Sequence, residues 1–398
     1  MSPPPHTTPG PEPLAVPLGA ACLTVLPRLA RALDGGAPVL PFAASAPPAV
    51  APPHDPADLP DGLAVVVGTS GSTGTPKRAL LTAAALRASN RATHERLGGP
   101  GQWLLALPAH HVAGLQVLLR SLDAGTTPVA MDLTDGFAPG AFVAATRELT
   151  AGARHYTSLV PTQLLRLLDH PRGPEALRSL DAVLVGGAAL PPRLRRRAER
   201  SSVHVVATYG MSETGGGCVY DGTPLPNTEI AFDEEGRIHL GGATVAHGYL
   251  GRPDLTHDAF GVDEDGVRWF RTDDVGHTDE HARLHVDGRV DDLVNTGGIK
   301  VAPRLVEEAV LEHVPGVAEV VVVGAPDLEW GEAVCALVVL EPGAVRAGLT
   351  TAEVRAHLRG LLPDHALPRR VATVARVPLR GPGKPDRRAV AAIFAVRG

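Results

Sequence analysis

Short apolar runs that end at a turn recur along this chain, and they constrain its fold more than any other feature. The first is LAVVVG, from Leu63 to Gly68, and the same design returns in WLLALP, AVLVGG and VHVVATYG. Such runs are typical of strands buried on both faces. The segments between them, such as AAALRASNRATHERL, AGLQVLLRSLDAG and PTQLLRLLDH, carry apolar residues three and four positions apart, as amphipathic helices do. The alternation predicts an α/β domain with a mostly parallel sheet.

The N-terminal residues follow a different pattern. Residues 1–12 and 46–60 are rich in proline, and we expect irregular backbone in both. The segment ACLTVLPRLARALDGG between them has the apolar spacing of a helix, so it predicts one short helix.

The C-terminal part of the chain predicts a second domain. From about Leu225 to His285 the elements shorten and have acidic or glycine turns, which predicts β-hairpins appended to the large domain. Beyond them the order is helix, two strands, helix, and a last strand with a tail, which suits a small α+β domain. Single cores stop growing near ~250–300 residues, and this chain has 398. We therefore predict domains over residues 1–289 and 290–398.

The charge of the chain argues against nucleic acid as a partner. Lys and Arg number 37 against 43 Asp and Glu, and the basic residues are scattered rather than gathered into a stripe. We expect a small-molecule partner instead.

The cysteines and the N-terminus indicate a cytoplasmic protein. Cys22, Cys218 and Cys335 are far apart and lack C-x-x-C spacing, so neither a disulfide framework nor a zinc site is expected. The N-terminus has no basic segment followed by an apolar run, and no apolar stretch of about 18 residues occurs, so neither secretion nor a membrane span is expected.

The glycine-rich segment GTSGSTGTPK directly follows the first apolar run and is a candidate phosphate loop. Glycines let backbone N–H groups turn toward an anion, and hydroxyls and a lysine add donors and a positive charge. It differs from the P-loop pattern GxxxxGK[ST], because two residues separate the last glycine from the lysine. Such runs also serve as linkers, but the position between a strand and a helix favours phosphate binding. The candidate residues are Thr69, Ser70, Gly71, Ser72, Thr73, Gly74 and Lys77.

The segment YGMSETGGG also follows an apolar strand and groups an aromatic ring, a hydroxyl and a carboxylate. Tyr209 is suited to stacking on a nucleobase, Ser212 to donating to a phosphate, and Glu213 to binding a hard cation such as Mg²⁺. A strand end whose tyrosine packs and whose glutamate caps a helix explains the same residues.

Acidic residues and arginines lie together in RTDDVG and GRVDD. A carboxylate that accepts both ribose hydroxyls, with an arginine nearby, is ordinary nucleotide-site chemistry, although acidic hairpin turns are also simply solvated. Near the C-terminus, LRGPGKPDRR places Lys384 between glycine and proline. Taken alone, that lysine is an ordinary surface charge.

The order of these motifs resembles the adenylate-forming superfamily of acyl-CoA ligases, firefly luciferases and peptide-synthetase adenylation domains. That superfamily shares TSGSTGTPK, YGxTE, RTxD, GRxDD followed by GG, and a terminal GK, and this chain has all five in that order, with Ser in place of Thr and RTDD in place of RTGD. The resemblance implies a large N-terminal domain of α/β subdomains plus a small β-barrel. It also implies a smaller, mobile C-terminal domain after a hinge.

The resemblance also implies roles for individual residues in binding ATP, Mg²⁺ and the acid. The TSGSTGTPK loop would bind the triphosphate, and Lys384 would contact the attacking carboxylate and the α-phosphate. The remaining roles are adenine contact by Gly187, Ala188 and Tyr209, phosphate and Mg²⁺ binding by Ser212 and Glu213, ribose binding by Asp274 beside Arg289, and a hinge at Asp291.

Two further segments resemble the o-succinylbenzoate–CoA ligases of menaquinone biosynthesis. They are QWLLALPAHHVAGLQVLLRSLDAG and TSLVPTQLLRLL. The resemblance implies formation of an acyl-adenylate from a carboxylic acid and ATP, followed by transfer of the acyl group to coenzyme A. It places His111 at the acyl pocket. Arg120 is a candidate partner for a second carboxylate, with Ser158, Thr162 and Gln163 as polar groups of the pocket.

Other interpretations stay open at this point. Another aryl- or acyl-CoA ligase of the superfamily fits most of the motifs, and a non-catalytic nucleotide-binding homologue is a second alternative, although it would be expected to lack Glu213 or Lys384. An amino-acid adenylation domain fits less well, because PAHHVAG lacks the acid that would bind an α-amine. The sequence also leaves open whether the chain forms a homodimer.

Overall fold

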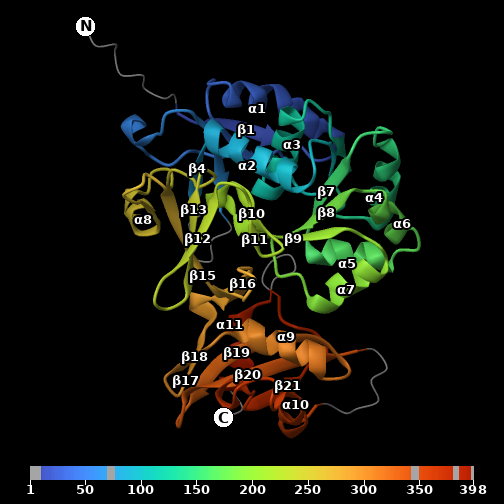
Figure 1. The fold of residues 1–398 in the computed structure, drawn as a ribbon, viewed down its shortest axis with the longest axis vertical. Helices are drawn as coiled ribbons and strands as arrows, with labels where there is room; N and C mark the ends of the chain where they lie inside the picture. The colour runs from blue at the N-terminus through green and yellow to red at the C-terminus, as the bar shows by residue number, and fades with distance from the viewer. Residues whose placement is uncertain (1–9, 70–76, 342–348, 380–384, 396–398) are drawn as a thin grey trace.

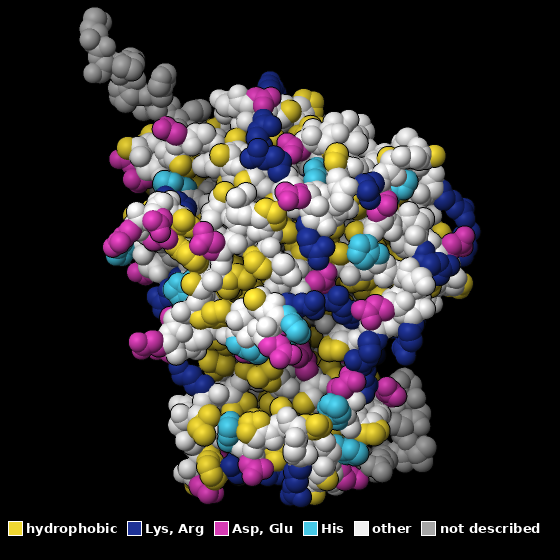
Figure 2. Space-filling view, viewed as in Figure 1, with side chains coloured by type: hydrophobic (Ala, Val, Ile, Leu, Met, Phe, Trp, Pro, Cys, Tyr) yellow, Lys and Arg dark blue, Asp and Glu magenta, His cyan; other side chains and the backbone are white. Residues whose placement is uncertain are grey.

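The computed structural model describes residues 10–69, 77–341, 349–379 and 385–395. Most of the chain forms a large body, and the elements that follow β16 form a smaller one beneath it (Figure 1). Acidic and basic side chains are interspersed over the face shown in Figure 2 rather than separated into patches.

A four-stranded sheet in the order β1-β2-β3-β4 opens the fold. Leu29 of α1 and Val65 of β3 are fully buried in one core. The elements are β1 (Glu12–Val16), η1 (Gly19–Val25), α1 (Leu26–Leu33), β2 (Val39–Ala43), β3 (Leu63–Gly68) and β4 (Arg78–Thr82).

A seven-stranded sheet in the order β11-β10-β9-β8-β7-β5-β6 forms the centre of the large body. Strands β6, β5, β7, β8 and β9 run parallel, whereas β10 and β11 are antiparallel additions. The mostly parallel sheet predicted from the sequence is therefore confirmed. Its strands are β5 (Gln102–Leu105), β6 (Val129–Ala130), β7 (His155–Leu159), β8 (Ala182–Val185), β9 (Val205–Met211), β10 (Gly216–Tyr220) and β11 (Thr223–Pro224). The helices are α2 (Ala83–Arg96), α3 (Val112–Asp123), α4 (Pro139–Ala145), α5 (Pro161–Asp169), α6 (Gly173–Arg178) and α7 (Pro192–Arg200).

The predicted hairpins form a third sheet that ends the large body. Its path is β12-β13-β15-β14, with β16 also paired to β15, and all of these pairs are antiparallel. The closed barrel implied by the superfamily resemblance stays a prediction. The elements are β12 (Thr228–Phe232), β13 (Arg237–Gly242), α8 (Pro253–Ala259), β14 (Phe260–Val262), β15 (Arg268–Thr278) and β16 (Leu284–Arg289).

The smaller body contains a five-stranded sheet with helices on both faces. Val306 and Val310 of α9 pack on one face, and Val390 and Phe394 of α11 pack on the other. The elements are η5 (Val290–Asp292), β17 (Val294–Thr296), β18 (Ile299–Val301), α9 (Pro303–His313), β19 (Val317–Asp327), β20 (Gly331–Leu340), α10 (Thr351–Leu358), β21 (Arg370–Thr373) and α11 (Arg387–Ala395). The boundary after residue 289 stays a prediction.

Three expectations about local structure were wrong. The candidate phosphate loop leads into a strand rather than a helix, because residues 78–82 pair antiparallel with β3 before α2 begins. The N-terminal region is not irregular up to residue 12, since Glu12 begins β1. The predicted C-terminal tail contains α11, whose apolar residues cover the open face of the small sheet.

The cysteines agree with the absence of a disulfide framework. All three are buried free thiols. Within the described ranges, no helix is both long enough and apolar enough to cross a membrane.

Candidate active site

The two described ends of the glycine-rich loop are held together. The backbone N–H of Thr69 donates to the carbonyl of Lys77 at 2.8 Å. The Lys77 ammonium lies 5.2 Å from the centre of the Tyr249 ring, within the range of a cation–π contact. The other predicted phosphate-binding residues, Ser70, Gly71, Ser72, Thr73 and Gly74, lie outside the described residues.

The YGMSETGGG segment lies directly beside this loop. Strand β9 ends at Met211, and a single 3-10 turn over Ser212–Thr214 follows it. The Ser212 hydroxyl donates to the carbonyl of Gly68, the last residue of β3, at 3.1 Å. Two motifs far apart in the sequence are therefore joined where their strands end.

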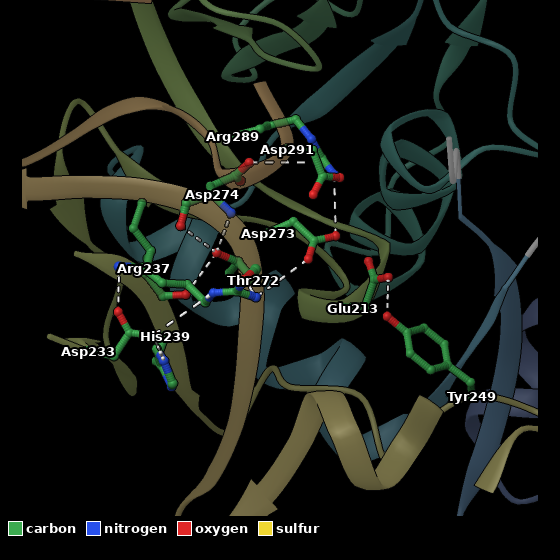
Figure 3. A network of polar contacts seen from close by, with 11 residues as sticks. Glu213, Asp233, Arg237, His239, Tyr249, Thr272, Asp273, Asp274, Arg289 and Asp291 are labelled. Atoms are coloured by element: carbon green, nitrogen blue, oxygen red, sulfur yellow. Dashed lines mark hydrogen bonds and ion pairs between the residues drawn. The ribbon is translucent and has the colours of Figure 1, made fainter. Parts of the chain in front are cut away.

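Glu213 is a buried carboxylate, 7% exposed, held by one tyrosine. The Tyr249 hydroxyl donates to its Oε1 at 2.8 Å (Figure 3). Burial raises the pKa of Glu213, while the hydrogen bond from Tyr249 and the charge of Lys77 oppose that rise. Tyr249 was not among the residues predicted for the site, and its segment AHGYLGRP carries no signal that would have identified it.

Asp274 is the second carboxylate of the site. The Tyr209 hydroxyl donates to its Oδ2 at 2.8 Å, and its backbone N–H donates to the Thr272 hydroxyl at 3.0 Å. Burial raises the pKa of Asp274, opposed by the Tyr209 hydrogen bond and by Arg289. The structure thus brings together two residues for which the superfamily resemblance implies adenine and ribose contacts.

Arg289 lies among three aspartates at the junction between the two bodies (Figure 3). It faces Asp274 across the β15–β16 ladder, and their closest side-chain atoms are 4.0 Å apart. Its guanidinium also pairs with Asp273 at 3.3 Å and with Asp291 at 3.5 Å. Asp291, the predicted hinge residue, is exposed and lies in η5, directly after β16.

The segment predicted to contact adenine follows β8. Gly187 has φ of +75°, a conformation that favours glycine. Gly187 and Ala188 are both exposed in the loop after Val185. They are accessible at the carboxyl end of a parallel strand, where ligands of α/β sheets commonly bind.

His111 occupies the N-cap position of α3, beside His110. The two rings are 4.2 Å apart. His111 is exposed, but partial desolvation of its ring lowers its pKa. Burial and the neighbouring His111 lower the pKa of His110 to about 4. Both imidazoles are therefore neutral at pH 7. Gly114 allows the helix to pass close to the preceding turn, because a Cβ there would lie 2.4 Å from the carbonyl oxygen of Pro108.

Arg120 is buried, not solvated, with only 3% of its surface exposed. Its guanidinium lies over the Trp103 ring at 5.1 Å and donates to the Tyr220 hydroxyl at 3.4 Å. Among the described residues it has no carboxylate partner, and its Nε has no hydrogen-bond acceptor. A buried cation without an anion is costly to maintain, so this position is suited to an anionic ligand.

The remaining predicted pocket residues differ in their exposure and in their hydrogen-bond partners. Ser158 is buried on β7, and Thr162 is exposed in the first turn of α5. The Gln163 amide bonds to backbone groups instead, donating to the Ala106 carbonyl at 3.0 Å and accepting from Val160 N–H at 2.9 Å. Gln163 thus positions the start of α5 rather than facing a ligand.

Lys384 lies outside the described residues, but the segment that follows it is anchored. Arg387, the first residue of α11, pairs with Glu307 of α9 at 2.9 Å and with Asp292 of η5 at 3.4 Å. The start of α11 is therefore tied to the residue next to the predicted hinge.

The two bodies also touch through α7 and α9. The guanidinium of Arg196 pairs with Glu312 at 2.5 Å, and Arg193 donates to the Val317 carbonyl at 3.4 Å.

Within the described residues no group of three or more His, Cys, Asp or Glu side chains is arranged to hold a metal ion. Glu213 offers one buried carboxylate. A Mg²⁺ ion that is bound mainly by nucleotide phosphates needs only one or two such protein ligands. The donor set therefore fits Mg²⁺ carried by ATP rather than a metal held by the protein alone.

Comparisons with known proteins place these features in one family. Residues 21–250 match the family described as "AMP-binding enzyme", and residues 306–384 match the family described as "AMP-binding enzyme C-terminal domain". The chain is 43% identical over 392 residues to a probable 2-succinylbenzoate–CoA ligase of Mycobacterium tuberculosis, covering 96% of this chain and 98% of that one. It is 33% identical to a sulfoacetate–CoA ligase of Cupriavidus necator, covering 91% and 72%.

A solved structure shows the same fold. The o-succinylbenzoate CoA synthetase of Bacillus subtilis, in complex with its acyl-adenylate intermediate, superposes with a TM-score of 0.69 at 28% identity. The match covers 83% of this chain and 69% of that one.

Proposed function

The chain belongs to the AMP-binding enzyme family, and we propose that it is an ATP-dependent acid–thiol ligase that converts 2-succinylbenzoate and coenzyme A to the CoA thioester. AMP and pyrophosphate would be the other products. We place this step in menaquinone biosynthesis and in the cytoplasm.

The choice of acid rests on one observation, which is that Arg120 is buried without a carboxylate partner among the described residues. A diacid that is activated at one carboxylate must bring a second carboxylate into the pocket, and burying that charge requires a cation. Arg120 is buried on α3, the helix that starts at His111, and has no carboxylate partner among the described residues. The 43% identity to a probable 2-succinylbenzoate–CoA ligase supports the assignment independently.

The reaction proceeds in two steps. In the first, a carboxylate oxygen of the acid attacks the α-phosphorus of ATP, and the bond to pyrophosphate breaks. In the second, the thiolate of coenzyme A attacks the acyl carbon, and AMP leaves with the bonding electrons. Both steps conserve oxidation state and need no further reactant.

The residues of the site would bind the nucleotide and orient the acid. Asp274, held by Tyr209, would accept the ribose hydroxyls, and the loop at Gly187 and Ala188 would contact adenine. Thr69, Ser212 and Lys77 would hold phosphate oxygens with the rest of the glycine-rich loop. Glu213 would bind Mg²⁺, which would neutralise phosphate charge.

The acid would lie between α3 and the carboxyl ends of β7 and β9. His111, neutral at pH 7, would bound the pocket near the reacting carboxylate. Ser158 and Thr162 would add hydroxyl groups to its wall.

The two half-reactions would require the C-terminal domain to take up two orientations. We propose that residues 290–398 rotate about Asp291 relative to residues 1–289. In one orientation Lys384 would stabilise the charge that develops on the α-phosphate. In the other, coenzyme A would reach the acyl carbon in its place.

A substrate panel tests the assignment. Exchange of labelled pyrophosphate into ATP is measured with 2-succinylbenzoate, benzoate, decanoate and sulfoacetate. We expect 2-succinylbenzoate to give the highest kcat/KM by at least tenfold. A higher value for another acid would reassign the substrate within the family, and ATP binding without exchange for any acid would support the non-catalytic alternative.

A further inference from the structure

Five buried side chains form a polar cluster between α2, α3 and the central sheet. They are Asn90, His94, Trp103, Gln116 and Arg120, and each is less than a tenth exposed. Each has at least one nitrogen or oxygen with no hydrogen-bond partner among the described residues. Native proteins rarely leave buried polar atoms unpaired, so such a concentration needs an explanation.

Contacts show that these side chains belong to one region. Arg120 lies 5.1 Å over the Trp103 ring, and it shares the Tyr220 hydroxyl with Thr93, the neighbour of His94. The charge of Arg120 helps to lower the pKa of His94, so the two side chains are close. Asn90 lies one helical turn before His94 and therefore on the same face of α2.

The unpaired atoms of the polar cluster are mostly hydrogen-bond donors. The free nitrogens are Asn90 Nδ2, His94 Nε2, Trp103 Nε1 and Arg120 Nε, against two free oxygens, Asn90 Oδ1 and Gln116 Oε1. Burial, followed by the charge of Arg120, lowers the pKa of His94, so its ring is neutral and its Nε2 can carry a hydrogen. A carboxylate only accepts hydrogen bonds, so its oxygens match this set.

The carboxylate that acts on His94 is not paired with Arg120. Asp123 at the end of α3 raises the pKa of His94 but pairs with Arg87 at 3.8 Å. Arg120 is left as a cation that an anion from outside the described residues can satisfy.

The polar cluster is connected to the reaction site. The Gln116 amide donates to the carbonyl of Gly215, two residues after Glu213. At Gly216 a Cβ would lie 3.3 Å from Gln116 Cγ, so glycine there permits the close approach of α3. Helix α3 therefore carries both Gln116, which contacts the segment after Glu213, and Arg120, one helical turn further on.

We propose that Asn90 and His94 are specificity-determining residues, which together with Arg120 hold the carboxylate of the substrate that is not activated. The inference rests on the proposed function and adds two residues of α2 to it. The Asn90 amide and the His94 imidazole donate to the carboxylate oxygens, and Arg120 supplies the opposite charge. The enzyme thereby selects diacids over monoacids of the same shape.

The test compares one diacid with two monoacids. The variants are Asn90→Leu and His94→Leu, with Glu95→Gln, an exposed residue of the same helix, as the matched control. The acids are 2-succinylbenzoate, 4-oxo-4-phenylbutanoate and 2-butanoylbenzoate, and each monoacid retains one of the two carboxylates. AMP release in the presence of coenzyme A gives kcat/KM for each pair.

We expect each leucine variant to lower kcat/KM for the diacid about 10- to 100-fold, the range for loss of one hydrogen bond to a charged group. For the monoacid that the enzyme accepts, kcat/KM should stay within about twofold of the value for the unaltered protein. Glu95→Gln should change kcat/KM for neither the diacid nor the monoacid. His94→Gln, which restores a donor, should recover part of the diacid activity. An equal loss for both classes of acid, or no loss, overturns the inference.

Two outcomes separate this inference from the proposed function. If the unaltered protein does not use 2-succinylbenzoate, the proposed substrate is wrong and the inference falls with it. If it does use the diacid but the leucine variants keep the same diacid-to-monoacid ratio, only the inference fails. Should a leucine variant not fold, Asn90→Asp keeps the volume and places a competing carboxylate in the polar cluster, which should reduce diacid use selectively.

Discussion

The Tyr209 hydroxyl donates to the carboxylate of Asp274 at 2.8 Å, across 65 positions of the sequence. This contact joins the end of β9 in the central sheet to β15 in the third sheet. It also determines how Asp274 titrates, because burial raises the pKa of Asp274 and the Tyr209 hydrogen bond lowers it.

Replacing Tyr209 by Phe should move the acid limb of the pH profile of kcat/KM for ATP to higher pH. In the proposed site only the ionised Asp274 accepts both ribose hydroxyls, so kcat/KM for ATP falls as the pH drops through its raised pKa. Tyr209→Phe removes a bond that favours the ionised form, so the pKa rises further. The expected loss is about 5- to 50-fold on the acid limb and becomes smaller as the pH rises. The pH profile of kcat/KM is the measurement, and an acid limb that does not move would contradict the role of Tyr209.

Replacing Tyr249 by Phe should increase the concentration of Mg²⁺ needed for activity. The Tyr249 hydroxyl opposes the rise in the pKa of Glu213, so its loss favours the protonated carboxyl group, which does not bind a cation. We expect the half-saturating Mg²⁺ concentration to rise about 3- to 10-fold. Glu213→Gln should lower kcat at least 100-fold at any Mg²⁺ concentration.

Tyr156→Phe is the matched control for this prediction. Tyr156 is also a buried tyrosine, but its hydroxyl donates to the Leu97 and Gly99 carbonyls, away from the candidate site. It should cost about 1 kcal/mol of unfolding free energy and leave the Mg²⁺ requirement unchanged. Equal Mg²⁺ requirements for all three proteins would refute the role assigned to Tyr249.

Removing the ion pair between Arg196 and Glu312 should change the balance between the two half-reactions. The pair joins α7 to α9 and therefore favours the orientation of the two bodies in this structure. Exposed ion pairs contribute little to stability, so Glu312→Ala should shift the ratio of adenylate formation to thioester formation only modestly, by about 1.4- to 5-fold. Single-turnover rates of each step give this ratio.

Salt and a second variant control for other effects of Glu312→Ala. Glu319→Ala removes an exposed carboxylate from β19 and should leave the ratio unchanged. Because salt screens exposed pairs, the difference between Glu312→Ala and the unaltered protein should shrink in about 0.5 M NaCl. A difference that persists at high salt would show that the ion pair is not its cause.

The fold was predictable where the spacing of apolar residues in a segment indicated a single helix or strand. The parallel strands β5, β8 and β9 and helices α3 and α9 follow directly from apolar spacing. Strand β4 was missed because RALLT is too short to show periodicity, and only its pairing with β3 makes it a strand. Helix α11 was missed because the preceding proline and glycine residues resemble those of an irregular tail.

Only those residues of the candidate site that lie within recognisable motifs could be predicted from the sequence. Glu213, Asp274 and Tyr209 belong to recognisable segments. Tyr249, the partner of Glu213, and the pairing of Tyr209 with Asp274 are found only through tertiary contacts. Arg120 illustrates the same limit, because an arginine near the end of an amphipathic helix is usually solvated. Its burial depends on Trp103 and Tyr220, which come from other parts of the chain.

Replacing Lys384 by Ala should impair one half-reaction selectively. In the proposed mechanism its charge acts at the α-phosphate during adenylation and is withdrawn before coenzyme A reacts. Adenylate formation should fall at least 100-fold, and thioester formation from supplied acyl-adenylate should change less than about threefold. Equal losses in the two steps would refute the assigned role.

Formation of the CoA thioester of 2-succinylbenzoate by the purified protein is the most direct test of the central claim. With ATP, Mg²⁺, coenzyme A and the acid present, mass spectrometry should detect the thioester and one AMP per thioester formed, and omission of ATP should abolish both. Absence of this thioester, while another acid yields its own, would contradict the account.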